Sequence, residues 1–345
     1  MRVRWLHTAL LSGVLALGML PMSADAATTL RLAHFWPAGS AINQQVFRVW
    51  ADAIEQASDG ELEVQIFPSE TLAGADHAYR ATVDGIADIT ATAQGYTAGR
   101  FPLTQIIELP GVSSDAEQGS CIAQTLFSEN RALAREYRDS HVLFLFTTGP
   151  GFINTRARPV RAPDDLAGLR IRRPTVVVGE LLESLGAQPV GMPAPATYTA
   201  MQRGVIDGVT LPWEGMKTFR LNELAHQHTV MPLYTLTFVA TMNRQTYQRL
   251  PAHLQQVIDD HSGMQWARRA GRVFQAQDTA GRQQVQGDDH HVIEIQHPLD
   301  DPRWGPPLHG AINGYLQQLE QQGLPARKLY RQAREAAREC SGGHA

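Results

Sequence analysis

Two arginines in a short alternating segment are the side chains best placed to bind a small anion. In residues 169–172, which read Leu-Arg-Ile-Arg, a strand would put Arg170 and Arg172 on the same side. An arginine near the carboxyl end of such a strand points toward the crevice where α/β folds bind ligands. Its planar guanidinium can hold a carboxylate through two parallel charge-assisted hydrogen bonds, which a lysine cannot match. Arg172 is therefore the candidate carboxylate ligand, and the alternative is an arginine on the solvated surface.

Other ionisable residues form no comparable pattern. Residues 288–291 read Asp-Asp-His-His, but adjacent histidines on an extended segment face opposite ways, so a surface loop is favoured over a metal site. His226 and His228 would share one side only in a strand and have no evident carboxylate partner, so we expect them on the surface. Glu108 and Glu214 could act as an acid–base pair, but nothing in the sequence fixes their separation.

The motifs of common enzyme classes are absent. The chain contains no Gly-x-Ser-x-Gly, Walker, His-Glu-x-x-His or Gly-x-Gly-x-x-Gly pattern. An enzyme of this sequence would lack a visible nucleophile, so we expect a protein that is not an enzyme and that has no catalytic residue, metal or cofactor.

Strands alternate with helices along the chain, which is the pattern of βα units and an α/β fold. Residues 29–34 are expected to form a strand followed by a helix, and residues 62–66 a second, half-buried strand. Beyond Pro251, apolar residues at helical spacing predict a long amphipathic helix that runs toward Val285.

One short phrase occurs at equivalent points of two βα runs. Residues 85–89 read Gly-Ile-Ala-Asp-Ile, and residues 204–208 read Gly-Val-Ile-Asp-Gly. In each copy the glycine ends a helix, and the aspartate can hydrogen-bond the turning backbone before the next strand. The repeat favours two similar lobes. The apolar run 141–147 reads as a buried strand, and its break at residues 148–151 marks a crossover between the lobes.

Length and composition limit the classes of function. The 345 residues are 43% hydrophobic and 19% charged, with a formal net charge of −4. These values are typical of a globular protein of about two domains. Nucleic-acid binders present a basic face, and this charge balance argues against a nucleic-acid partner.

The amino terminus has the pattern of a cleavable export signal. Arg2 and Arg4 precede the apolar run 9–20, which is too short to span a bilayer. Small residues follow at Ala24 and Ala26, so we expect cleavage after Ala26 and export of a soluble protein.

Cys121 and Cys340 are the only cysteines. Export to an oxidising compartment would permit a disulfide between them, but their wide separation in sequence leaves the pairing open. Two cysteines are too few for a structural zinc site, and we expect no catalytic role for either.

Several motifs, in order along nearly the whole mature chain, resemble those of TRAP transporter solute-binding proteins of the dicarboxylate-binding type. Each motif is weak alone, and their number and order make the resemblance specific. They are residues 33–37, 67–69, 84–88, 165–172, 186–190, 204–208, 211–214 and 249–251.

This resemblance implies a two-lobed α/β periplasmic binding protein with a cleft between the lobes, crossing strands and a long connecting helix. A signal peptide would occupy residues 1–26. One lobe would comprise residues 27–149 plus 238–280, and the other residues 150–237 plus 281–345.

The resemblance also implies a function. The protein would capture an organic acid in the periplasm, with Arg172 on its carboxylate, and deliver it to a TRAP membrane permease of two unlike subunits. Arg170 and Arg173 would then be scaffold or surface residues. Two alternatives remain: the ligand-binding subunit of a membrane sensor, or an exported hydrolase that uses Glu108 or Glu214. The sequence leaves open whether the acid is a uronate, a keto or hydroxy acid, a dicarboxylate or an aromatic acid, and whether a cation accompanies it.

Two departures from the sialic-acid-binding members of the family bear on the ligand. Those members keep a second arginine in the crossover and an asparagine before a proline, where this chain has Phe152 and Leu211. A second anionic or polyhydroxylated end therefore has no obvious partner. Aromatic residues in the motif-bearing loops, Tyr234 among them, indicate a partly aromatic pocket, with core packing as the alternative for each ring. Besides Arg172, the candidate ligand contacts are Trp36, Gln94, Tyr96, Phe152, Trp213 and Phe238.

Overall fold

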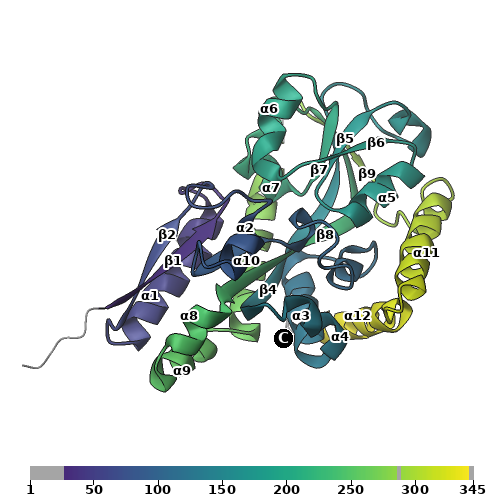
Figure 1. Ribbon diagram of the computed structural model, residues 1–345. Coiled ribbons are helices and arrows are strands. Elements are labelled where there is room, and N and C mark those ends of the chain that lie inside the picture. Colours follow the sequence, from purple (N-terminus) through teal and green to yellow (C-terminus); the bar gives the residue numbers. More distant parts are fainter. Residues whose placement is uncertain (1–26, 286–288, 342–345) are drawn as a thin grey trace, which may run out of the picture.

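Nine strands form one mixed sheet in the part of the chain that the computed structural model describes, residues 27–285 and 289–341 (Figure 1). The signal peptide expected at residues 1–26 lies outside the described residues. The strands are β1 (Thr28–His34), β2 (Leu62–Phe67), β3 (Ile89–Ala93), β4 (Ser140–Thr155), β5 (Arg170–Arg173), β6 (Gln188–Gly191), β7 (Gly208–Leu211), β8 (Gln227–Asn243) and β9 (His291–Glu294).

The sheet has the same arrangement when followed from either end. Its order is β2-β1-β3-β8-β4-β7-β5-β6, with β9 added beside β8. β1 lies parallel between β2 and β3, and β5 lies parallel between β6 and β7. β3 is antiparallel to β8, and β7 is antiparallel to β4. The α/β class and the two similar lobes expected from the repeated phrase are therefore confirmed.

The long strands β4 and β8 cross between the two halves. They run antiparallel to each other, with Gly151 opposite Tyr234. The sequence predicts that the strand over residues 141–147 is broken at 148–151, but β4 continues to Thr155 through a shift in register at that point. This stretch includes a proline, which cannot donate to the ladder, and the register shift accommodates it.

Helices pack around this sheet (Figure 1). They are α1 (Arg48–Ala57), α2 (Ala78–Val83), α3 (Ala116–Glu129), α4 (Arg131–Ala134), α5 (Val176–Ser184), α6 (Thr197–Gln202), α7 (Trp213–Thr218), α8 (Arg244–Arg249), α9 (Ala252–Asp260), α10 (Met264–Gln283), α11 (Gly305–Gln321) and α12 (Ala326–Cys340). Two single turns, η2 (Gln94–Tyr96) and η3 (Thr104–Glu108), contribute to the site described below.

The prediction of one long helix beyond Pro251 was wrong, because this segment forms two helices. α9 ends at Asp260, and α10 begins at Met264. Between them Gly263 has φ 75° and donates its backbone N–H to the Leu143 carbonyl of β4 at 2.7 Å. A left-handed residue tied to the sheet ends one helix and lets the next begin in a new direction.

α10 connects the two halves through close contacts at two glycines. A Cβ on Gly271 would lie 2.7 Å from the Ala116 carbonyl oxygen of α3, and one on Gly281 would lie 2.4 Å from the Trp213 carbonyl oxygen of α7. Any larger residue would therefore push α10 away from one half or the other. This is the long connecting helix that the family resemblance implies.

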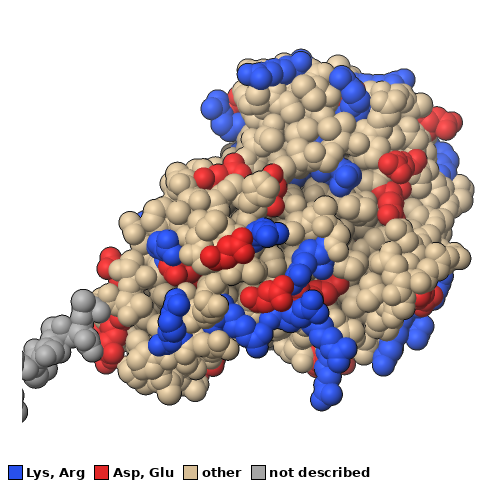
Figure 2. Space-filling model, viewed as in Figure 1, with Lys and Arg blue, Asp and Glu red and all other residues tan. Residues whose placement is uncertain are grey.

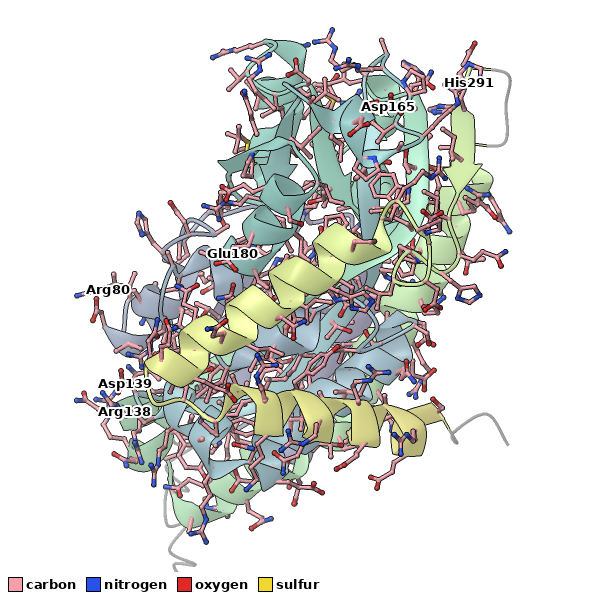
Figure 3. The ribbon with its side chains drawn as sticks, turned by 90° about the vertical axis from the view of Figure 1, so that its right-hand side faces the viewer. Arg80, Arg138, Asp139, Asp165, Glu180 and His291 are labelled. Atoms are coloured by element: carbon pink, nitrogen blue, oxygen red, sulfur yellow. A yellow bond between two sulfur atoms is a disulfide. The ribbon has the colours of Figure 1, made fainter. Side chains whose placement is uncertain are left out.

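The C-terminal helices α11 and α12 lie across the molecule in the view of Figure 3. A disulfide joins Cys340 at the end of α12 to Cys121 in α3, which resolves the question that the sequence left open. The bond ties the end of α12 to α3.

Charged side chains of both signs are mixed on the face shown in Figure 2, without a continuous basic surface. Among the described helices, none is both long enough and apolar enough to cross a bilayer.

Candidate ligand-binding site

Arg172 is fully buried at the end of β5, so the alternative of a solvated surface arginine is excluded. Its Nε donates to the Met192 carbonyl at 2.9 Å, and its Nη1 donates to the Thr210 carbonyl at 3.1 Å. Its Nη2 donates to the Tyr96 hydroxyl at 3.2 Å. These three bonds fix the plane of the guanidinium.

The positive charge of Arg172 has no acidic partner among the described residues. A buried charge without an opposite charge is strongly unfavourable, so this environment favours a bound anion. A guanidinium has five N–H donors, and the three bonds above leave one free on each of Nη1 and Nη2. Two N–H groups on neighbouring nitrogens match the two oxygens of a carboxylate.

Tyr96 brings the first half of the molecule to this arginine. It ends η2, directly after β3, and its hydroxyl accepts hydrogen bonds from Arg172 Nη2 and from the Ala194 backbone N–H at 3.1 Å. With both bonds accepted, the hydroxyl proton is available to a ligand oxygen. The preceding Gly95 allows this approach, because a Cβ there would lie 2.1 Å from Cγ2 of Thr175.

Tyr234 of β8 completes a polar group around Thr210. Its hydroxyl donates to the same Thr210 carbonyl that Arg172 uses, at 3.0 Å. The ring lies against Gly151, where a Cβ would come within 2.3 Å of it. Burial raises the pKa of Tyr234, so its hydroxyl stays neutral. The site thus draws on both halves and on a crossing strand.

Gln94 lies two residues before Tyr96 and is also buried. Its Nε2 donates to the Tyr137 hydroxyl at 3.0 Å, a bond that also helps to hold the loop after β3 in place. Its Oε1 has no hydrogen-bond partner among the described residues, and a buried acceptor of this kind can take a hydrogen bond from a ligand.

Trp36 and Phe238 lie together in the aromatic core of the first half. Their ring centroids are 5.1 Å apart, and only 1% of Trp36 is exposed. Phe35, which the sequence interpretation passed over, stacks on Trp36 at 4.1 Å and lies 5.8 Å from the Tyr96 ring. Of these three rings, Phe35 is therefore the one that lies beside Tyr96, which hydrogen-bonds to Arg172. The only signal for it in the sequence is its place in the same motif as Trp36.

Phe152 and Trp213 are brought together in a small cluster of their own with Val285. Their ring centroids are 4.5 Å apart, and the Arg282 guanidinium lies 5.2 Å from the Trp213 ring. Neither ring belongs to the main aromatic core that contains Trp36 and Phe238.

The expectation that His228 lies on the surface was wrong. It falls inside β8 and is 1% exposed, with Nδ1 2.7 Å from Asn154 Oδ1 and Nε2 2.9 Å from His290 Nδ1. Burial lowers the pKa of His228 to about 3, so the imidazole is neutral. Within the described residues, no three His, Cys, Asp or Glu side chains are arranged to hold a metal ion.

Glu108 and Glu214 are both buried but have separate partners. Glu108 accepts the Thr237 backbone N–H at 3.1 Å, and Glu214 accepts the Thr218 hydroxyl at 2.6 Å. Burial raises the pKa of Glu108 to about 8 and that of Glu214 to about 7.

Residues 32–301 match the model of the DctP family, bacterial extracellular solute-binding protein, family 7. The chain belongs to this family. The two-lobed α/β fold is confirmed by a TRAP solute-binding protein from Rhodoferax ferrireducens in complex with copurified benzoate. That protein is 34% identical, and the match covers 92% of this chain and 100% of that one with a TM-score of 0.87.

Two further relatives agree with the assignment to family 7. A marine metagenome TRAP solute-binding protein specific for aromatic acid ligands, in complex with 3-hydroxybenzoate, is 30% identical over 91% of this chain and 99% of that one, with a TM-score of 0.85. The outer membrane transporter protein TsaT of Comamonas testosteroni is 26% identical over 72% of this chain and 74% of that protein. This family 7 protein is therefore a TRAP solute-binding protein for an organic acid, and its family and structural neighbours are binding proteins rather than enzymes.

Proposed function

We propose that the protein captures an aromatic monocarboxylate in the periplasm and delivers it to the permease of a TRAP transporter. The observation that carries this proposal is the buried guanidinium of Arg172, which has two free N–H donors and no acidic partner among the described residues. One carboxylate satisfies both the charge and the donors.

The charge of the site supports a single carboxylate rather than two. Among the described residues, Arg172 is the only arginine or lysine that is buried. A second carboxylate drawn into the site would find no second buried cation. Dicarboxylates are one ligand type of the family, and we propose that they bind here more weakly than monocarboxylates.

The rings beside Tyr96 support an aromatic ligand. Phe35 stacks on Trp36 and faces toward Tyr96, so apolar surface adjoins the carboxylate anchor. The relatives with 34% and 30% identity were solved with benzoate and with 3-hydroxybenzoate, respectively.

Capture would proceed by closure of two lobes about the crossing strands. We propose the lobe limits given by the sequence, 27–149 plus 238–280 and 150–237 plus 281–345, with one exception. α12 would move with the first lobe, because the disulfide ties it to α3. The Tyr96–Arg172 hydrogen bond would form only on closure. A ligand that contacts both lobes shifts the population toward the closed form, which is the form presented to the permease.

Isothermal titration calorimetry with benzoate tests the proposal. Arg172→Ala should abolish binding and ligand-dependent thermal stabilisation, and Arg172→Lys should weaken binding at least tenfold because lysine keeps the charge but not the paired donors. The matched control is Arg170→Ala, on the same strand but partly exposed and paired with Asp207. It should bind benzoate as wild type does. Unchanged affinity in a folded Arg172→Ala variant would overturn the assignment.

A further inference from the structure

Two phenylalanine rings from opposite halves of the molecule lie nearly parallel to each other beside the Arg172 site. Phe35 follows β1, and Phe219 is the C-cap residue of α7. Their ring centroids are 6.3 Å apart, and their planes differ by only 22°. A nearly parallel pair of rings on two bodies that close on each other is the arrangement that grips a flat group.

Phe35 is connected to the carboxylate anchor through one residue. Its ring lies 5.8 Å from the ring of Tyr96, and the hydroxyl of Tyr96 is 3.2 Å from Nη2 of Arg172. A ligand whose carboxylate lies on Arg172 would therefore extend its body along Tyr96 toward Phe35.

Phe219 is the apolar link between the two cores. It is partly buried and packs against both the main core and the smaller core of the second half, which includes Leu211 and Met216. No other partly buried residue packs against both of these cores in the described part of the chain. Its position on the moving lobe means that its contact with Phe35 forms and breaks with closure.

A groove between the halves lies next to this pair. It has a volume of about 430 Å³ and is lined from the first half by Pro37, two residues after Phe35, and from the second by Thr218, which precedes Phe219. The groove is thus lined by sequence neighbours of both rings, while Phe35 itself is buried in the main core and Phe219 is partly buried.

We propose that Phe35 and Phe219 form an aromatic clamp that closes on the ring of the ligand and selects aromatic over aliphatic acids. This inference rests on the proposed function and deepens it. Carbon atoms in contact lie about 3.5–4 Å apart, so a ring held between the two phenyl groups needs them about 7–8 Å apart. That requires the two rings to lie about 1–2 Å farther apart than the 6.3 Å of this structure.

Paired titrations of benzoate and cyclohexanecarboxylate test the clamp, because the two acids share their charge and ring size but differ in the π system. Wild type should prefer benzoate. Phe219→Leu should weaken benzoate binding about fivefold to tenfold, leave cyclohexanecarboxylate binding nearly unchanged, and so remove the preference. Phe219→Tyr should retain it. Phe35→Leu should act in the same direction, with its fold checked by thermal melting because Phe35 is 3% exposed.

Tyr247→Leu is the matched control, since this partly buried ring stacks on His141 at 3.7 Å and belongs to α8. It should leave the preference intact. If Phe219→Leu lowers the affinity for both acids equally or for neither, the clamp is wrong while the Arg172 assignment stands. If wild type binds no benzoate, both the clamp and the proposed function fail.

Discussion

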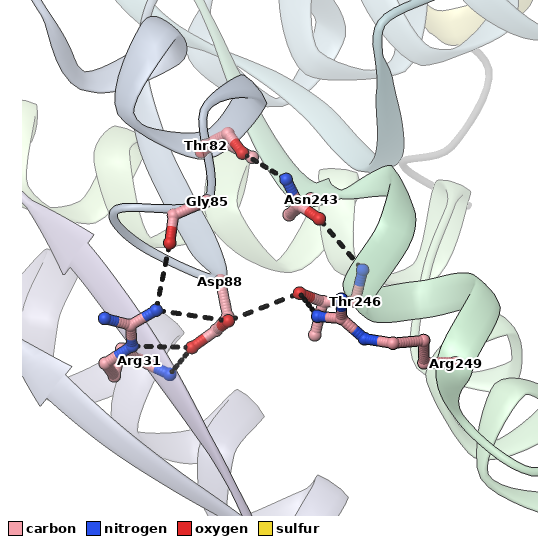
Figure 4. Close-up of polar contacts among 7 residues, drawn as sticks. All are labelled: Arg31, Thr82, Gly85, Asp88, Asn243, Thr246 and Arg249. Atoms are coloured by element: carbon pink, nitrogen blue, oxygen red, sulfur yellow. Dashed lines mark hydrogen bonds and ion pairs between the residues drawn. The ribbon is translucent and has the colours of Figure 1, made fainter.

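The two halves of the sheet each contain an ion pair of the same design, Arg31 with Asp88 and Arg170 with Asp207. In the first half, Asp88 Oδ2 accepts the backbone N–H and the Nε–H of Arg31, both at 2.9 Å (Figure 4). In the second, Asp207 Oδ2 accepts the same two groups of Arg170, also at 2.9 Å. The aspartate of each repeated phrase thus pairs with an arginine of the adjacent parallel strand, β1 in the first half and β5 in the second.

Each pair also holds the end of a crossing strand. Asn243, the last residue of β8, donates its N–H to the Asp88 carbonyl at 2.7 Å. Arg156, directly after β4, donates its N–H to the Asp207 carbonyl at 3.2 Å. The two crossing strands are therefore anchored in equivalent ways at opposite ends of the molecule.

The two copies differ in their surroundings. The side chain of Asp88 is 13% exposed and that of Asp207 is 34% exposed. Asp88 also accepts the Thr246 hydroxyl at 3.3 Å, and Asn243 caps the same helix α8 by accepting the Thr246 N–H at 2.8 Å (Figure 4). Both copies thus fasten the adjacent parallel strand, and the first copy also contacts the neighbouring helix α8.

The functional difference lies two residues beyond the arginine of each pair. Ala33 lies two residues after Arg31 and pairs with Thr90 of β3. Arg172 lies two residues after Arg170 and pairs with Val209 of β7. Equivalent places in the two lobes thus hold a methyl group and a guanidinium. The buried positive charge at this position therefore belongs to the second lobe alone.

The second half has no counterpart to the disulfide that ties α12 to α3, because Cys121 and Cys340 are the only cysteines of the chain. Replacing both Cys121 and Cys340 by serine should lower the free energy of unfolding by about 3 kcal/mol, because the cross-link closes a long loop. Urea denaturation measures the change, and benzoate affinity should stay unchanged because the bond joins α3 to α12. An equal stability with and without the bond would show that it adds nothing to the anchoring of the first half.

The two-lobed fold and the position of Arg172 could be predicted from local sequence patterns. The repeated phrase gave two similar lobes because a glycine that ends a helix and an aspartate that fastens a strand are local requirements. The strand alternation around Arg172 and the family motifs led to a residue that the structure shows buried and unpaired with acid.

The failures were in packing between distant segments. Phe35 and Trp36 are adjacent in sequence, so no local rule decides which ring adjoins Tyr96 and which lies in the core. His228 is buried because β8 continues through it and Asn154 of β4 meets its ring. The break between α9 and α10 depends on a bond from Gly263 to β4. These contacts join residues far apart in sequence, and patterns of neighbouring residues do not record them.

Buried carboxyl groups in the two halves offer a second, smaller contrast. Burial raises the pKa of Glu108 to about 8 from an ordinary value of 4.5. The folded state therefore binds this proton more tightly than the unfolded state, and its contribution to stability is lost as pH rises from 4.5 through 8. Glu108→Gln keeps an acceptor for the Thr237 N–H and removes the titration.

Denaturation at several pH values checks this prediction. Relative to Glu108→Gln, wild type should lose on the order of 2 kcal/mol between pH 5 and pH 8. Glu214→Gln is the matched variant in the second half, and its effect should be complete by a lower pH because burial raises the pKa of Glu214 only to about 7. Parallel pH profiles for wild type and Glu108→Gln would contradict the assignment of a neutral Glu108.

The smallest expected effect bears most directly on the paired aspartates. Asp88→Asn keeps the shape of the side chain but removes the negative charge of the carboxylate to which Arg31 and Thr246 donate hydrogen bonds. This substitution should lower the free energy of unfolding by about 1 kcal/mol. Asp207→Asn should cost less, because solvent reaches both partners of that pair and screens their attraction. Urea titration of the two variants in parallel measures the difference. Equal losses of unfolding free energy would mean that the burial of Asp88 and its contact with α8 add nothing to the stability of the first ion pair. The two ion pairs would then stabilise their lobes equally, in spite of their different surroundings.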